Sequence, residues 1–157
     1  MIEFIETVRI ERPVARVWRA LTLPSEVVQW DGGVQAALDA PPDYPRPGQH
    51  VRWSYRLGPI PLILHDRPTE VVAEQTLRSS ILLGPFAFDE TYTLRSPTPT
   101  RTELSARLCV WSRSKIFAAW LERRLGAPLA RSTVQGSLAA IRAHCEADAA
   151  SSSPAST

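Results

Sequence analysis

Glu90 is the side chain in this sequence that is best placed to do chemistry. It lies in a run with the alternation of a β-strand, residues 86–95, in which Phe88, Glu90 and Tyr92 share one face. If that face is the inner one, the carboxyl group projects into the protein. An unpaired carboxyl group in such a place has a raised pKa and can serve as an acid, a base or a polar anchor. Glu90 is therefore the candidate catalytic residue.

Two alternatives for this carboxyl group stay open. Glu90 is able to form a salt bridge with Arg78 or Arg107 on a neighbouring strand, which would be a structural role. A bulge of one residue would instead turn Asp89 inward and Glu90 outward.

The histidines do not assemble a second site. His65 is next to Asp66, but adjacent residues of a strand point to opposite faces, which argues against an acid–base pair. His50 and His144 have no second ligand at the spacing of a metal site, so we expect no metal. The sequence also lacks a glycine-rich phosphate loop and the context of a Ser/His/Asp triad, and we expect no cofactor.

Composition limits the class of protein. The 157 residues have a net charge of +2 and near-balanced signs along the chain, which argues against a nucleic-acid surface. We expect one domain, residues 1–147, followed by a disordered Ala/Ser/Pro tail, residues 148–157. Two isolated cysteines, an alternating acidic N-terminus and the lack of an apolar run of about 18 residues predict a cytoplasmic protein.

The elements that must position Glu90 are mostly strands. The clearest is residues 49–57, where Val51, Trp53, Tyr55 and Leu57 alternate with polar residues. Further strand patterns, separated by Gly/Pro turns, cover residues 2–10, 34–38, 62–72, 76–83, 86–95 and 102–110.

Helical spacing appears in two places. Two short helices are predicted after the first strand, on either side of Leu23-Pro24. A long helix is predicted over residues 127–145, with Val134, Leu138 and Ile141 on its apolar stripe. The predicted fold class is α+β: a curved antiparallel sheet wrapped around a long C-terminal helix.

This order of elements resembles a known family. It is similar to the START-like or SRPBCC superfamily, the helix-grip fold of polyketide cyclase/dehydrases and of the plant allergen Bet v 1. The resemblance covers residues 1–147. The residues that carry it are Ile10-Glu11-Arg12-Pro13-Val14-Ala15-Arg16-Val17-Trp18, Leu23-Pro24, Trp30, Gly48, Tyr92-Thr93-Leu94 and Thr102.

The resemblance implies a ligand cavity between the concave face of the sheet and the long helix. By the alternation of the strands, the sheet residues expected to line it are Trp53, Tyr55, Ile81, Leu83, Phe88, Tyr92, Leu104 and Leu108. The helix residues expected to line it are those of the apolar stripe, Val134, Leu138 and Ile141. The alternative is that these side chains fill the core.

Three functions fit the resemblance, because the fold alone does not determine activity. The first is binding or transport of an apolar small molecule or lipid. The second is an enzyme of the polyketide cyclase or aromatase type. The third is a protein-interaction domain that resembles the Hsp90 co-chaperone activators.

The segment 113–125 is expected to be a lid at the mouth of the cavity. Ile116, Phe117, Trp120 and Leu121 form an apolar face at helical spacing, and the surroundings are basic. A basic amphipathic helix can also make peripheral contact with an anionic membrane. The alternative is a helix that is packed permanently on the edge of the sheet.

Overall fold

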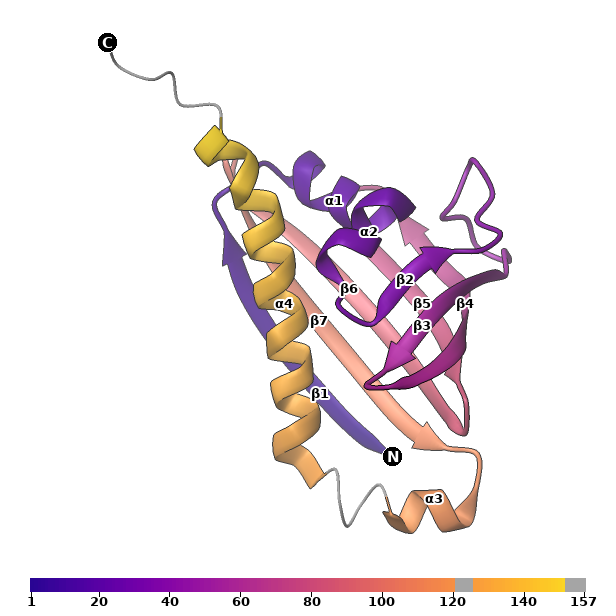
Figure 1. The fold of residues 1–157 in the computed structure, drawn as a ribbon. Helices are drawn as coiled ribbons and strands as arrows, with labels where there is room; N and C mark the ends of the chain where they lie inside the picture. Colours follow the sequence, from indigo (N-terminus) through magenta and orange to yellow (C-terminus); the bar gives the residue numbers. More distant parts are fainter. Residues whose placement is uncertain (121–125, 152–157) are drawn as a thin grey trace.

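The computed structural model describes residues 1–120 and 126–151. Within these residues, seven strands form one antiparallel sheet in the order β1-β7-β6-β5-β4-β3-β2 (Figure 1). The strands are β1 (Ile2–Ile10), β2 (Val34–Ala37), β3 (Val51–Leu57), β4 (Ile60–Val72), β5 (Thr76–Leu83), β6 (Phe86–Thr98) and β7 (Arg101–Ser112). The helices are α1 (Val14–Thr22), α2 (Pro24–Trp30), α3 (Lys115–Trp120) and α4 (Gly126–Ser151). The predicted fold class is confirmed.

Alternating burial shows that β7 turns one face toward the core. Thr102, Leu104 and Ala106 are buried, while the residues between them are only partly covered. Because β7 pairs with β1 on one side and β6 on the other, its inward side chains sit between two covered strands. This is the period-two pattern of a sheet with one face toward the core.

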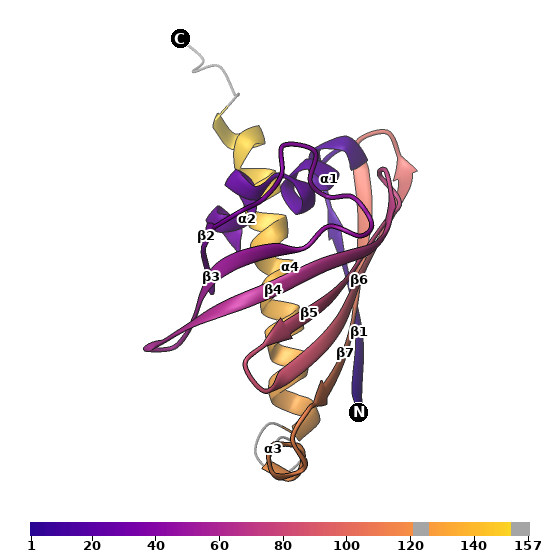
Figure 2. The ribbon, with the colours of Figure 1, turned by 90° about the vertical axis from the view of Figure 1, so that its right-hand side faces the viewer.

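The sheet bends at irregularities in its pairing. One register shift occurs in β4 between Pro68 and Glu70, where the proline has no N–H to give to a neighbouring strand. A second shift falls in β2 between Val34 and Ala36. Figure 2 shows the result, with β3 and β4 running obliquely to β1 and β7. A sheet bent in this way encloses space on its concave side.

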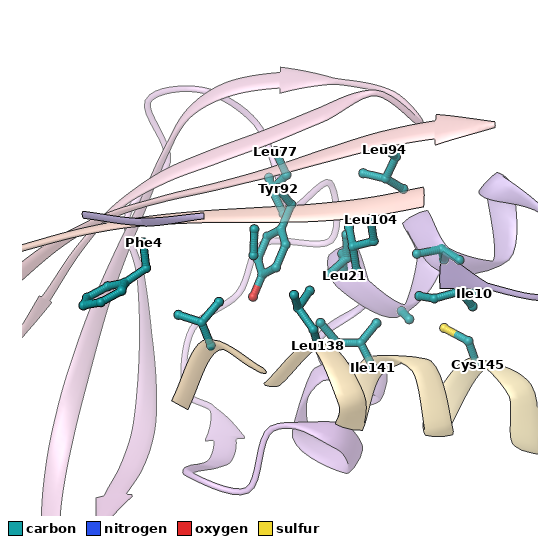
Figure 3. Close-up of a cluster of buried hydrophobic side chains, with 14 residues drawn as sticks. Phe4, Ile10, Leu21, Leu77, Tyr92, Leu94, Leu104, Leu138, Ile141 and Cys145 are labelled. Atoms are coloured by element: carbon teal, nitrogen blue, oxygen red, sulfur yellow. The ribbon is translucent and has the colours of Figure 1, made fainter. Parts of the chain in front are cut away.

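Helix α4 closes that concave side along β1 (Figure 1). The predicted stripe is buried: Leu138 is 2% exposed, and Ile141 and Cys145 are fully covered. Figure 3 shows these side chains meeting Tyr92 and Leu104 from the sheet. The main core therefore lies between the sheet and the C-terminal half of α4, and helix α1 covers its end.

Two helical segments differ from the sequence prediction. Helix α4 continues to Ser151, so residues 148–151 are helical although they were predicted to belong to the disordered tail. Within this last part of α4, Asp148 Oδ2 forms an ion pair with Arg16 Nε at 2.7 Å, a long-range contact that the sequence pattern does not reveal. The predicted lid segment, residues 113–125, is described only as far as Trp120, the last described residue of α3. Residues 152–157 and 121–125 lie outside the described residues.

Glu26 joins three helices beneath the surface. This carboxylate of α2 is 8% exposed and accepts hydrogen bonds from Arg16 Nη1 at 2.7 Å and Arg19 Nε at 2.8 Å on α1. His144 Nε2 of α4 lies 3.0 Å from its Oε2. Burial acts to raise the pKa of Glu26, but the hydrogen bonds from His144, Arg16 and Arg19 outweigh it and the pKa is lowered. The charged form of Glu26 therefore holds α1, α2 and α4 together.

We predict that Glu26→Gln lowers the free energy of unfolding by about 3 kcal/mol at neutral pH, because it removes the buried carboxylate that pairs with Arg16, whose side chain is only 9% exposed. A carboxyl group with a lowered pKa stabilises the fold above its ordinary pKa, and this contribution is lost as the pH falls through the lowered value. The difference between wild type and variant should therefore shrink in acid. Urea unfolding at several pH values measures it.

Glu11→Gln is the matched control. Glu11 pairs with Arg101 at 3.1 Å, but its side chain is 51% exposed. Loss of an exposed pair of this kind should cost less than about 1 kcal/mol. Equal losses for the two variants would show that the Glu26 network does not hold the helices.

Candidate functional site

Two adjoining hollows lie between the concave face of the sheet and the helices. The first, here called the α2 hollow, has a volume of about 90 Å³ and is lined by Leu21, Val27, Trp30, Asp31, Val34, Tyr44, Trp53, Leu64, Asp66, Leu77, Ser79, Ile81, Glu90 and Tyr92. The second, the α4 hollow, has a volume of about 150 Å³ and is lined by Asp31, Tyr55, Leu64, Ile81, Leu83, Phe88, Glu90, Tyr92, Ala106, Leu108, Thr133, Val134 and Ser137. They share five residues, so we call the pair the cleft.

Most of the residues predicted to line a cavity are at the cleft. Those on its walls are Trp53, Tyr55, Ile81, Leu83, Phe88, Tyr92, Leu108 and Val134. Leu104, Leu138 and Ile141 are not, because they pack into the main core at 0%, 2% and 0% exposure. The sheet and α4 touch directly at those three residues, and they separate only near Thr133, Val134 and Ser137.

Glu90 lies on the wall of both hollows. The pairing of β5 with β6 is regular from Thr76↔Thr93 to Leu83↔Phe86, so no bulge exchanges Glu90 with Asp89. The salt bridge considered for Glu90 is also not formed: Arg78 lies 3.8 Å from Asp89, and Arg107 pairs with Glu3 at 3.0 Å.

The environment of Glu90 makes it a weak acid. Its Oε1 accepts a hydrogen bond of 2.9 Å from the Tyr92 hydroxyl. Burial raises the pKa of Glu90 to about 7, and the negative charges of Asp31 and Asp66 act in the same direction, against the hydrogen bond from Tyr92. Near neutral pH this group can therefore both donate and accept a proton.

Asp66 is a second buried carboxyl group in the cleft, and it was missed as a site residue. It is 5% exposed, and its Oδ2 accepts a hydrogen bond of 2.7 Å from the Tyr44 hydroxyl. Its Oδ1 is buried and has no hydrogen-bond partner among the described residues. Burial raises the pKa of Asp66, and the nearby Tyr44, Ser79 and Trp53 side chains oppose this only in part.

Asp31 supplies the third carboxyl group, from the end of α2. Its Oδ1 accepts hydrogen bonds from the backbone N–H groups of Gly33 at 2.9 Å and Val34 at 3.3 Å. Burial raises the pKa of Asp31, and these two hydrogen bonds act against the shift. The turn that starts β2 therefore fixes this carboxyl group at the wall shared by the two hollows.

Aromatic rings form much of the remaining wall. The Tyr44 and Trp53 rings meet edge to face, with centroids 5.8 Å apart. The Tyr55 ring lies so close to Gly33 that a Cβ atom there would overlap it. The absence of a side chain at Gly33 thus allows Tyr55 to occupy its place beside Asp31.

Part of what was missed was visible in the sequence. Asp66 has the same strand parity as Leu64, so the alternation within β4 places it on the inner face. Asp31-Gly32-Gly33 reads only as the end of a helix, and Tyr44 belongs to a proline-rich loop without periodicity. Neither pattern indicates that these side chains reach the cleft.

Among the described residues, no histidine lines the cleft, and for His65 the strand parity predicts this. His50 and His65 stack on each other, with Nε2 and Nδ1 2.9 Å apart, on the face of β3 and β4 opposite Asp66. Among residues 1–120 and 126–151, no three His, Cys, Asp or Glu side chains gather closely enough to hold a metal ion.

The predicted lid lies only partly within the described residues. Ile116 is on α3 and is 82% exposed, and α3 also contains Phe117 and Trp120. Leu121 lies outside the described residues. Arg113, just before α3, donates its backbone N–H to Pro85 O at 3.0 Å, which ties this segment to the turn between β5 and β6. No helix of the described chain is long and apolar enough to cross a membrane.

Comparison of sequences identifies no relative: no protein-family model matches the chain, and no curated protein matches it. Solved structures do match. A START superfamily protein from Mycobacterium smegmatis has a TM-score of 0.74 at 13% identity, over 92% of this chain and 97% of that one. The Zhui aromatase/cyclase from Streptomyces sp. R1128 has a TM-score of 0.70 at 15% identity, over 94% and 95%.

A third solved structure also matches. Ara h 8.0201 has a TM-score of 0.67 at 10% identity, over 93% of this chain and 98% of that one. Sequence identities this low are evidence for a shared fold but not for a shared activity. The chain has the helix-grip fold of the START-like or SRPBCC superfamily, as its sequence resemblance predicted.

Proposed function

We propose that this protein binds a small apolar molecule in the cleft. The observation that carries the proposal is the unfilled space of about 90 Å³ and about 150 Å³ between sheet and helices, bounded mainly by aliphatic and aromatic side chains. A single water needs only about 10–15 Å³ of such volume, so each hollow is larger than one or two waters require.

The walls explain why a ligand would enter. Water in the cleft meets Leu64, Ile81 and Phe88, which offer it no hydrogen bonds. An apolar ligand that displaces this water gains about 25 cal/mol for each Å² of apolar surface that it buries. The carboxyl and hydroxyl groups between the apolar residues would fix the orientation of the ligand.

A substitution that fills the cleft tests this proposal. Leu64 lines both hollows, and Leu64→Trp should occupy the space and abolish binding of a neutral apolar probe such as N-phenylnaphthylamine. Fluorescence titration measures the binding, and native mass spectrometry of the protein purified from its own host detects a retained ligand.

Ile63→Trp is the matched control, because Ile63 is the adjacent residue of β4, faces outward and is 42% exposed. It should leave probe binding unchanged. Binding that survives Leu64→Trp as well as Ile63→Trp would contradict a site in the cleft.

Glu90 favours a second candidate, an enzyme of the polyketide cyclase or aromatase type. A carboxyl group with a pKa of about 7, hydrogen-bonded to Tyr92 at the wall of an apolar cleft, has the properties of a general acid–base group. Turnover of a linear aromatic polyketide precursor that is lost in Glu90→Gln would support this reading. Binding of the precursor without turnover would support the first proposal, a protein that binds an apolar molecule without converting it.

The raised pKa of Glu90 predicts a pH dependence of stability. A carboxyl group whose pKa is raised on folding favours the fold at low pH, and this contribution is lost as the pH rises from the ordinary carboxyl value through about 7. A glutamine cannot ionise, so Glu90→Gln does not lose stability in this way as the pH rises. The variant should therefore gain up to about 3 kcal/mol over wild type between about pH 4 and about pH 8, as measured by urea unfolding.

Glu70→Gln serves as the control, since Glu70 is an exposed residue of β4. Its stability should follow that of the wild type across the same pH range. A Glu90→Gln profile parallel to both would mean that the Glu90 carboxyl group is not desolvated.

A further inference from the structure

All the charged side chains among the described residues that line the cleft are acidic. Asp31, Asp66 and Glu90 all reach the α2 hollow. None of the described residues that line either hollow is an arginine, lysine or histidine. A charge on His50, which stacks on His65 outside the cleft, acts to lower the pKa of Asp66, but it is the smallest of the influences on that group. Among the residues that the structure describes, no cationic side chain lines the cleft to pair with these carboxylates.

Each carboxyl group is nevertheless held in place by donors. Tyr44 donates to Asp66, Tyr92 donates to Glu90, and backbone N–H groups donate to Asp31. In Figure 3 the Tyr92 hydroxyl points from the sheet toward α4. Every one of these bonds favours the carboxylate form, which accepts them. The cleft therefore contains oriented acceptors.

One carboxylate oxygen of Asp66 accepts no hydrogen bond from the described residues. The side chain is 95% buried, since its exposure is 5%, and it forms part of the wall of the α2 hollow. Its Oδ1 has no hydrogen-bond partner among the described residues. An incompletely paired buried carboxylate costs free energy, and the positive charge of a ligand beside it would recover part of that cost.

We propose that the cleft selects an apolar small molecule that carries a protonated amine, with the ammonium group placed beside the Asp66 carboxylate in the α2 hollow. This rests on the proposed function and names its ligand class. A neutral alcohol can also donate, but a cation gains in addition from all three carboxylates, and charge-assisted hydrogen bonds are about twice as strong as neutral ones. The Tyr44 and Trp53 rings on the same wall add attraction for a cation.

A metal ion fits this site less well than an organic cation. Calcium and magnesium need about six oxygen ligands in close array. The described residues contain no group of even three acidic, histidine or cysteine side chains close enough for a metal. The apolar remainder of the cleft, including Leu64 and Ile81, is instead suited to the hydrocarbon part of an amine.

Binding of the amine should depend on pH in a definite direction. The groups that face the site are Asp31 after α2, Tyr44 of the loop, Tyr55 of β3, Asp66 of β4, and Glu90 and Tyr92 of β6, while α4 contributes the neutral Thr133 and Ser137. The tyrosines have raised pKa values because of burial and stay neutral. Raising the pH through about 7 ionises Glu90, so affinity for the amine should increase.

The test compares phenethylamine with phenethyl alcohol and phenylpropionate, which have nearly the same size and differ in charge. Isothermal titration calorimetry at about pH 8 should give an amine affinity at least about tenfold above that of the alcohol, with the acid weakest, and the preference should fall at about pH 5.5. Asp66→Asn should reduce the preference for the amine at least about tenfold.

Asp89→Asn is the control, because Asp89 lies next to Glu90 on the opposite face and pairs with Arg78. It should keep the preference of the wild type. If Asp66→Asn fails to fold, the wild-type comparison of amine and alcohol, with Glu90→Gln as the second variant, decides the question.

The outcomes separate this inference from the proposed function. Equal binding of amine and alcohol, lost in Leu64→Trp, would overturn the amine class and leave an apolar binding site. An amine preference that Asp66→Asn leaves unchanged would overturn the role of Asp66. Failure of all three compounds and of the neutral naphthalene probe to bind would overturn both proposals.

Discussion

The buried Glu26 carboxylate sets the position of the terminal helix and hence the shape of the interior. It receives hydrogen bonds from Arg16 and Arg19 of α1 and lies 3.0 Å from His144 of α4. With that end of α4 fixed, Leu138 and Ile141 pack directly against the sheet. A straight helix cannot follow a bent sheet along its whole length, so the space opens at the other half of α4 and beneath α2.

This geometry explains which residues of the cleft could be predicted from the sequence and which could not. Period-two alternation correctly indicated that Trp53 and Tyr92 face inward, because a strand has only two faces. The same rule could not distinguish core from cleft, which is why Leu104, Leu138 and Ile141 were expected at a cavity and instead fill the core. That distinction depends on where α4 meets the sheet.

The polar groups of the cleft were harder to predict from the sequence than its apolar walls. Asp31 and Tyr44 reach it from a turn and an irregular loop, for which no periodicity predicts direction. Three desolvated carboxyl groups in one apolar space are costly, and Asp66 retains an unpaired oxygen. Buried carboxyl groups with perturbed pKa values beside an unfilled space are typical of a site for a ligand. The binding and enzymatic readings share this feature and differ only in whether Glu90 transfers a proton.

The central claim is that these carboxyl groups are largely desolvated at the wall of an unfilled cleft. The most direct measurement is an NMR titration of carbon-13-labelled side-chain carboxyl groups, without ligand, from about pH 3 to about pH 9. The account predicts that Glu90 titrates near 7 and that Asp31 and Asp66 titrate above the ordinary aspartate value. Ordinary carboxyl titration by all three groups would contradict it, because it would mean that they are hydrated.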